Sequence, residues 1–180
     1  LDYYAFSKQE ETTRFVAPYH LTFHQGGLYL IGYCHTRKDL RIFAVERIRR
    51  LKVTDRRFSI SAGFDPERFF EGAWGLIRGQ QVRIKVVFSP KIAPWIAERV
   101  WHPTQSLRWL PGKRLELTLK VADTPEIRRW LLGFGPDGEI VEPAALREAL
   151  RVRAETLVHT LAPTRRPAQA ISLSGTPAAI

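Results

Sequence analysis

The sequence contains no methionine and only one cysteine, Cys34. A single cysteine cannot form an internal disulfide, and this usage is typical of a reducing compartment, so we expect a cytoplasmic protein. No run of about 18 apolar residues is present, and no charged and then apolar leader opens the chain, so a membrane-spanning helix and a secretory signal are both unsupported. Because position 1 is not methionine and Leu1–Phe6 already reads as a strand, we expect a piece of a longer protein.

Acidic residues are scarce relative to basic ones. The 180 residues include 28 Lys and Arg against 18 Asp and Glu, which gives a formal net charge of +10. A positive field attracts polyanions, so the composition indicates nucleic acid as the first class of partner and an anionic membrane surface as the second. We predict a nucleic-acid partner and no membrane partner. Hydrophobic residues make up 44% of the chain, which predicts a folded protein with a core.

The first third of the chain has no helical periodicity. Short alternating runs broken by turn residues predict strands at Asp2–Phe6, Thr13–Val16, His20–His24, Leu28–His35, Leu40–Arg47 and Ile48–Thr54. Gly26 and Gly27 are typical of a tight hairpin, because glycine accepts positive φ without a steric penalty. Strands this short cannot form a large sandwich, so we predict a small, strongly bent β-barrel over residues 1–62.

The rest of the chain changes pattern. Asp65 and Pro66 predict the start of a short helix in a linker over residues 63–80. Residues 81–161 then read as strand, helix, strand, strand, helix, strand, which is the order of a ferredoxin-like split β-α-β fold, with hydroxyl-capped helices after Ser89 and Thr124 and a terminal helix over Pro143–Leu161. Residues 162–180 predict a disordered tail. The expected fold class is mainly β plus α+β.

The stretch from Arg37 to Arg57 carries nine Lys and Arg against three acidic residues. Strand alternation places Arg41, Phe43 and Arg47 on one face, and the preceding strand presents aromatic side chains on one of its faces. Aromatic platforms beside cations are typical of single-stranded nucleic-acid binding, in which stacking contributes about 1–3 kcal/mol per base. Arginine's planar fork suits phosphate, so Arg41 and Arg47 are the main expected contacts. The predicted ligand-binding residues are Tyr19, His20, Tyr29, His35, Arg37, Arg41, Phe43 and Arg47.

Other interpretations of the same residues stay open. Tyr29 and Phe43 can be core residues, with the arginines a solvated rim. His20 and His24 share a strand face, but Cys34 and His35 point to opposite faces, so at most one of them joins a metal site, and we predict neither a metal nor a cofactor. Enzyme motifs such as a Gly-rich phosphate loop are missing from the sequence, so we predict that the protein is not an enzyme.

Three motifs of the first third of the chain are distinctive: Pro18-Tyr19-His20-Leu21, Leu28-Tyr29-Leu30-Ile31-Gly32-Tyr33 and Arg41-Ile42-Phe43-Ala44-Val45-Glu46-Arg47-Ile48. Together they resemble the WYL-domain family of bacterial transcriptional regulators. Residues from Val82 to about Leu161 resemble the C-terminal extension of these regulators, including Pro94-Trp95 and Trp130-Leu131-Leu132-Gly133. The sequence departs from the family in two ways, since Leu28 stands at the position of the eponymous tryptophan and the usual helix-turn-helix is not in this sequence.

The resemblance implies an Sm-like, SH3-type barrel that senses a nucleic-acid or nucleotide-like effector in a basic groove, and that often dimerises. We therefore predict the effector-sensing region of a transcriptional regulator, which binds single-stranded DNA and relays the signal to a DNA-binding domain outside this sequence. A homodimer is expected. Two alternatives remain open: a sensor of a small nucleotide messenger, and an oligomerisation module without a specific ligand.

Overall fold

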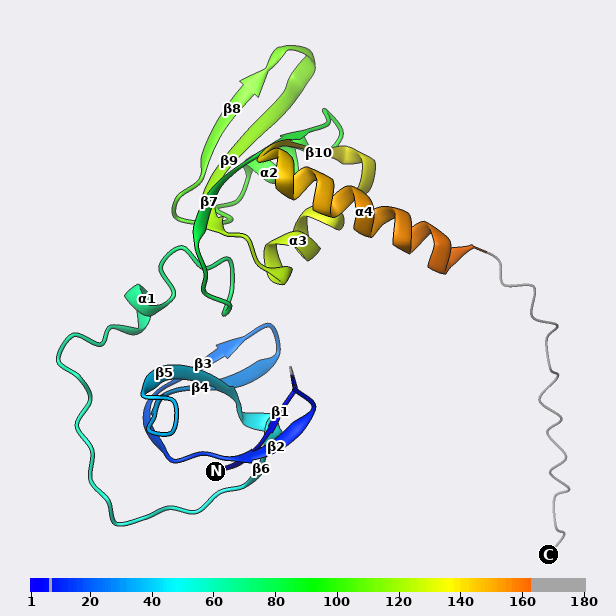
Figure 1. Cartoon of the computed structure of the whole chain (residues 1–180). Helices are drawn as coiled ribbons and strands as arrows, with labels where there is room; N and C mark the ends of the chain where they lie inside the picture. Colours follow the sequence, from blue (N-terminus) through cyan, green and yellow to red (C-terminus); the bar gives the residue numbers. More distant parts are fainter. Residues whose placement is uncertain (7, 163–180) are drawn as a thin grey trace, which may run out of the picture.

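The computed structural model describes residues 1–6 and 8–162, and it shows an N-terminal unit and a C-terminal unit joined by a linker (Figure 1). The N-terminal unit consists of two three-stranded antiparallel sheets, in the orders β2-β1-β6 and β3-β4-β5. Its strands are β1 (Asp2–Ala5), β2 (Glu10–Thr13), β3 (Val16–His24), β4 (Gly27–Cys34), β5 (Asp39–Ala44) and β6 (Ile48–Arg50). The expected tail, apart from Ala162, lies outside the described residues.

The predicted β-rich α+β class is confirmed, but in the described residues the six strands make two sheets and no closed barrel. The chain passes from β5 in one sheet to β6 in the other through the 3-10 helix η1 (Val45–Arg47). The Ala44 N–H donates to the Tyr3 hydroxyl at 3.2 Å, and the turn lets Ile48 pair with Tyr3. The predicted strand over Leu40–Arg47 is therefore wrong beyond Ala44.

The linker begins with a long segment without regular structure. Residues 51–60 contain no helix or strand, so the predicted strand over Ile48–Thr54 is wrong beyond Arg50. Helix α1 (Pro66–Phe69) follows, and Asp65 caps it as predicted, because its Oδ1 accepts hydrogen bonds from the backbone N–H of Glu67 at 2.9 Å and Arg68 at 3.4 Å.

The C-terminal unit has a four-stranded antiparallel sheet in the order β10-β7-β9-β8. This order confirms the predicted split β-α-β topology. Leucines at alternate positions of β9, together with Val121, are fully buried beneath the helices, as strand alternation requires. The elements are β7 (Gln81–Phe88), α2 (Ala93–Ala97), β8 (Ser106–Leu110), η2 (Pro111–Lys113), β9 (Arg114–Ala122), α3 (Pro125–Leu132), η3 (Gly135–Asp137), β10 (Gly138–Glu142) and α4 (Ala144–Leu161).

The hydroxyl caps predicted for α2 and α3 are wrong. Helix α3 starts at Pro125, but the Thr124 Oγ1 is buried and makes no hydrogen bond to the described residues. Helix α2 starts at Ala93, some residues later than expected, because the Ser89 hydroxyl instead donates to Asp137 Oδ1 at 2.7 Å and so ties the end of β7 to η3.

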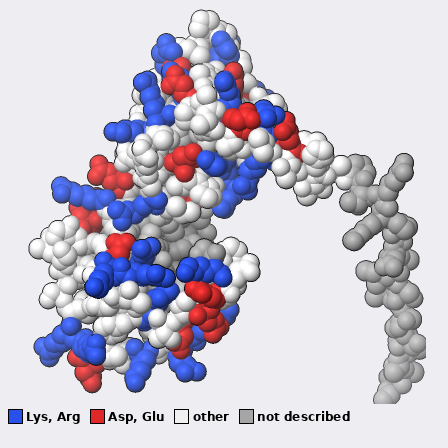
Figure 2. All heavy atoms as spheres, in the orientation of Figure 1, with Lys and Arg blue, Asp and Glu red and all other residues white. Residues whose placement is uncertain are grey.

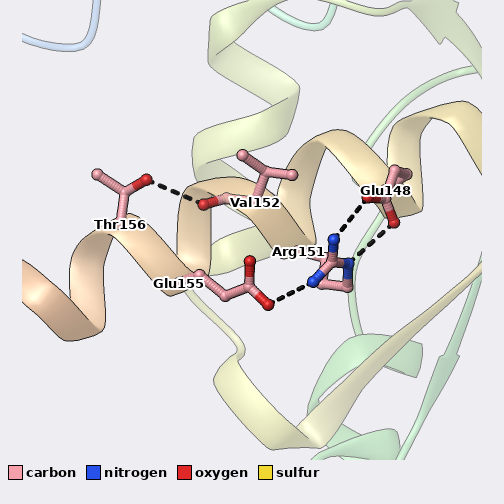
Figure 3. Close-up of polar contacts among 5 residues, drawn as sticks. All are labelled: Glu148, Arg151, Val152, Glu155 and Thr156. Atoms are coloured by element: carbon pink, nitrogen blue, oxygen red, sulfur yellow. Dashed lines mark hydrogen bonds and ion pairs between the residues drawn. The ribbon is translucent and has the colours of Figure 1, made fainter.

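Helix α4 packs on its own domain only through its first half. Leu146 and Leu150 are buried, whereas Leu157 is 53% exposed further along the helix. Figure 3 shows Arg151 between Glu148 and Glu155, and all three side chains are more than half exposed. The hydrogen bond to Glu148, followed by the attraction of both carboxylates, raises the pKa of Arg151 above its ordinary value.

Candidate anion-binding site

Four arginines line a cavity of about 640 Å³ between the N-terminal unit, the linker and α3. Arg41 comes from β5, Arg47 from η1, Arg78 from the linker and Arg129 from α3. We call this space the junction cavity. Figure 2 shows Lys and Arg side chains gathered where the two units face each other. Convergence of cations from four separate elements creates a concave surface suited to an anion.

The junction cavity runs along the free edge of a sheet. β5 is the outer strand of the β3-β4-β5 sheet. Its register pairs Ala44 with Tyr29 and Arg41 with Gly32, so Tyr29 and Arg41 point to opposite faces of the sheet. Both reach the cavity because it wraps around the edge. The expected single face of aromatic and arginine side chains is therefore not formed, and η1 also removes Arg47 from the alternation of β5.

Most of the arginine charge in the junction cavity is uncompensated. Among the described residues only Arg41 of the four has an ion pair, from Nη2 to Asp39 Oδ2 at 3.2 Å, and both partners are more than half exposed. Such a pair contributes little to stability, so Arg41 can exchange it for another anion. The Arg47 guanidinium lies 5.3 Å from the Phe6 ring centroid, and that of Arg78 lies 4.4 Å from Phe69. These cation–π contacts orient the guanidinium groups and leave their N–H donors available.

Glu126 positions the linker beside the cavity. Its two carboxylate oxygens accept hydrogen bonds from the backbone N–H groups of Leu76 and Ile77, each at 3.0 Å. A Cβ at Gly75 would lie 2.7 Å from Glu126 Oε1, so any other residue there would displace the Glu126 carboxylate from its present position. The acid lies in the first turn of α3, where the helix dipole favours a negative charge. The backbone next to Arg78 is thereby held against the C-terminal unit.

His24 is a further polar side chain on the cavity wall. Its Nε2 is buried and has no hydrogen-bond partner among the described residues. A buried polar atom without a partner is unfavourable and needs compensation, for example from a ligand or a water molecule. With Asp39 and Glu126 as the acidic lining residues, the four arginines leave an excess of positive charge in the cavity.

The structure brings together three of the predicted ligand-binding residues, Tyr29, Arg41 and Arg47. His20 and Arg37 are exposed but lie outside the junction cavity. Tyr19 instead stacks on Phe58, with ring centroids 6.3 Å apart, and does not line the cavity.

Two other predicted residues have different surroundings. Phe43 is only 5% exposed and packs edge-on against Tyr3, with centroids 5.2 Å apart, so it is a core residue and offers no open stacking face. His35 lies in a separate cavity beside Phe15.

Sequence reasoning missed Arg78 and Arg129. Both lie far along the chain from the basic stretch around Arg41, one in a segment interpreted as a linker and one on a helix interpreted as scaffold. Nothing local marks them, because only the tertiary fold brings them to the junction cavity. The cluster of Gly72, Gly75 and Gly79 just before β7 was the one available signal that the linker closely approaches other structure.

Over residues 1–6 and 8–162 no group of three or more His, Cys, Asp or Glu side chains is arranged to hold a metal ion. In the same part of the chain no helix combines the length and apolar character needed to cross a membrane.

Family models match both units of the chain. A WYL domain matches residues 1–53, and a WCX domain matches residues 80–158. The chain therefore contains a WYL domain followed by a WCX domain, in agreement with the resemblance that the sequence motifs indicated.

Among curated proteins, the chain is 28% identical over 160 residues to Protein PafC of Mycobacterium tuberculosis, in strains CDC 1551 / Oshkosh and ATCC 25618 / H37Rv. The match covers 84% of this chain and 46% of PafC, so the chain spans about half the length of these relatives.

Solved structures give weaker likenesses. A CRISPR Cas-related protein superposes with a TM-score of 0.53 and 13% identity, over 88% of this chain and 47% of that one, which indicates a shared fold only. Proteasome accessory factor B/C (PafBC) of Arthrobacter aurescens gives a TM-score of 0.43 and 21% identity, over 98% of this chain and 27% of that one.

Proposed function

We propose that this chain is the effector-sensing part of a transcriptional regulator, and that the junction cavity binds the phosphates of a nucleic-acid ligand, single-stranded DNA in the first instance. The observation that carries the proposal is the convergence of Arg41, Arg47, Arg78 and Arg129 on one cavity. Arginine forks match phosphate oxygens, and three of the four have no ion pair among the described residues. The match to a WYL domain supports the regulatory role.

The location of the cavity suggests how binding would be relayed. Arg41 and Arg47 belong to the N-terminal unit, whereas Arg129 belongs to the C-terminal unit and Arg78 to the linker. A phosphate chain that contacts all four would favour the arrangement of the units that brings them together. By linkage, the ligand shifts the equilibrium between arrangements only by its difference in affinity for them. We propose that the regulator is a cytoplasmic homodimer that binds its ligand and catalyses no reaction.

A small nucleotide messenger is the second candidate. The junction cavity's volume of about 640 Å³ favours this candidate, because such a size is typical of small-molecule sites. A cavity of this size accommodates only a short piece of a nucleic-acid strand. The third candidate function is an oligomerisation module that has no specific ligand.

Fluorescence anisotropy with a labelled single-stranded oligonucleotide, at two salt concentrations, tests these alternatives. A tracked phosphate backbone releases several counterions and gives a steep salt dependence, whereas a shallow slope with saturation by a mononucleotide indicates the small ligand. If neither the oligonucleotide nor the mononucleotide binds at low salt, the oligomerisation module is the remaining candidate.

Substitutions then test the residues. Arg41→Ala, Arg47→Ala, Arg78→Ala and Arg129→Ala should each weaken binding about tenfold and lower the salt slope by about one. Arg153→Ala is the matched control, because Arg153 is exposed on α4 and does not line the cavity. Unchanged affinity in all four variants, with circular dichroism confirming the fold, would exclude the junction cavity as the binding site.

A further inference from the structure

A second cavity of about 480 Å³ is lined by residues of the N-terminal unit and of the linker segment that follows it. Its apolar lining residues, which we call its apolar floor, include Val16 and Leu30 of the sheet and Leu51, Val53 and Phe58 of the linker segment. Leu30 follows Tyr29 in β4, so these two side chains point to opposite faces of the sheet. The second cavity is therefore on the other face of β4 from the Tyr29 wall of the junction cavity, and it requires an explanation of its own.

Aromatic rings form one side of the second cavity. The Phe15 and His35 rings have centroids 4.7 Å apart and an interplanar angle of 35°. The backbone holds this pair in place, because the His35 N–H donates to the Phe15 carbonyl at 2.9 Å. The Arg56 guanidinium lies 5.0 Å from the Phe15 centroid. Phe15 remains 37% exposed, so part of its ring is open to a ligand.

The charge around the second cavity has a single sign. Its cationic lining residues are Arg14, Lys52, Arg56 and Arg57, and its lining includes no Asp or Glu. None of the four has an ion pair within residues 1–6 and 8–162. Like charges held together without a counter-ion repel one another, and a bound anion relieves that repulsion. The junction cavity differs, because Asp39 and Glu126 line it.

A cavity lined by both apolar side chains and four cationic ones is complementary to an amphipathic anion. A fully hydrated inorganic ion would leave the apolar floor unused, and a neutral apolar molecule would leave the cations uncompensated. We propose that the second cavity binds a small planar aromatic anion, with its ring against Phe15 and its carboxylate or phosphate held by Arg56 and the neighbouring cations. Two sources share this chemistry, a nucleotide and an aromatic carboxylate. This site is independent of the proposed phosphate site at Arg41.

The fluorescent aromatic sulfonate 8-anilinonaphthalene-1-sulfonate is a direct probe for the second cavity. We expect saturable binding to the native protein and displacement by dAMP or by indole-3-carboxylate, whichever source applies, with weaker displacement by decanoate. Arg56→Gln should raise the Kd of the probe about tenfold, and Phe15→Ala about fivefold or more. Arg83→Gln and Phe23→Ala are the matched controls, because both residues are exposed and lie outside the cavity.

The outcomes separate this proposal from the one for the junction cavity. Arg41→Ala should leave the affinity for the probe unchanged, and Arg56→Gln should leave the salt slope of oligonucleotide binding unchanged. Probe affinity that is the same in Arg56→Gln, in Phe15→Ala and in the wild type would overturn the proposal. Displacement by decanoate alone would also overturn it, because the cavity would then select an apolar chain over an aromatic ring. Thermal melting of each variant checks that the probe reports a folded protein.

Discussion

The carboxylate Oε1 of Glu126 lies 3.0 Å from the backbone nitrogen of Leu76, 50 residues earlier in the chain. Oε2 of the same carboxylate accepts from Ile77. One side chain in the first turn of α3 thus fixes the linker at the point where it presents Arg78 to the junction cavity. The bond between these two residues joins the linker to a helix that packs in the core.

Glu126→Gln should release the Leu76–Ile77 backbone, because the amide keeps one acceptor oxygen and loses both the second acceptor and the charge. We expect hydrogen exchange at the Leu76 and Ile77 amides to accelerate about tenfold, since hydrogen bonds to charged groups contribute about 1.5–3 kcal/mol. Glu139→Gln is the control, on an exposed position of β10. Equal protection in both variants would show that Glu126 does not hold the linker.

Gly72 and Gly112 provide a matched pair of substitutions. Both have positive φ, +73° and +75°, but a Cβ at Gly112 meets open space, whereas one at Gly72 would lie 1.8 Å from the Gln81 side chain. Gly112→Ala should cost about 1–2 kcal/mol for the left-handed conformation alone. Gly72→Ala should cost more, because the Gln81 side chain must also move away from the new Cβ. Urea unfolding measures the difference, and equal costs would contradict it.

His102 should make stability depend on pH. Burial, the largest cause, lowers the pKa of His102 below its ordinary value of 6.5, with a smaller opposing effect from a hydrogen bond to Ala73. Its Nδ1 accepts from the Thr104 N–H at 3.2 Å, which requires a neutral ring at that nitrogen. The unfolded chain therefore takes up a proton at a higher pH than the folded chain. The stability that this histidine contributes is complete above pH 6.5 and is lost as the pH falls toward its lowered folded pKa.

Melting temperatures of wild type and His102→Asn between pH 7.5 and 5.5 measure this effect, because asparagine keeps an acceptor near Nδ1 and does not titrate. We expect the wild type to lose more stability on acidification than the variant. His159→Asn, on the exposed end of α4, should behave as the wild type does. Parallel curves for wild type and His102→Asn would rule out the titration of His102 as the cause.

Arg151 forms ion pairs with Glu148 and Glu155 on the surface of α4 (Figure 3). Arg151→Ala should increase hydrogen exchange in the turn that contains Glu155, by an amount that shrinks as salt concentration rises, because exposed ion pairs are screened. Arg147→Ala is the control, since Arg147 lies on the same helix and has no ion pair in the described part of the chain. An effect that does not depend on salt would point to the lost packing of the arginine side chain as its cause.

Local sequence patterns predicted several elements well for identifiable reasons. The cap at Asp65 depends on neighbours within a few residues, which the sequence displays directly. The order of strands and helices in the C-terminal unit also restricts its topology to the split β-α-β arrangement found in the structure.

The predictions from sequence are wrong where contacts between residues far apart in the chain determine the local structure. The strand predicted through Arg47 ends at Ala44 because the Tyr3 hydroxyl, 41 residues away, accepts its N–H. Ser89 does not cap α2 because Asp137 accepts from its hydroxyl. In both cases a side chain remote in sequence supplies the hydrogen bond that local reasoning had assigned to a neighbour.

The sequence by itself determined the family resemblance, the two kinds of unit and the excess of positive charge, because motif, periodicity and composition are properties of residues close together in the chain. Only the tertiary structure decided which cations meet. Arg41 and Arg47 join Arg78 and Arg129 because the linker folds back onto α3 through Glu126. Phe43 is excluded from any open surface because it packs against Tyr3. The sequence shows where basic residues are dense along the chain. A binding site requires their side chains to converge in space, and long-range packing creates that convergence.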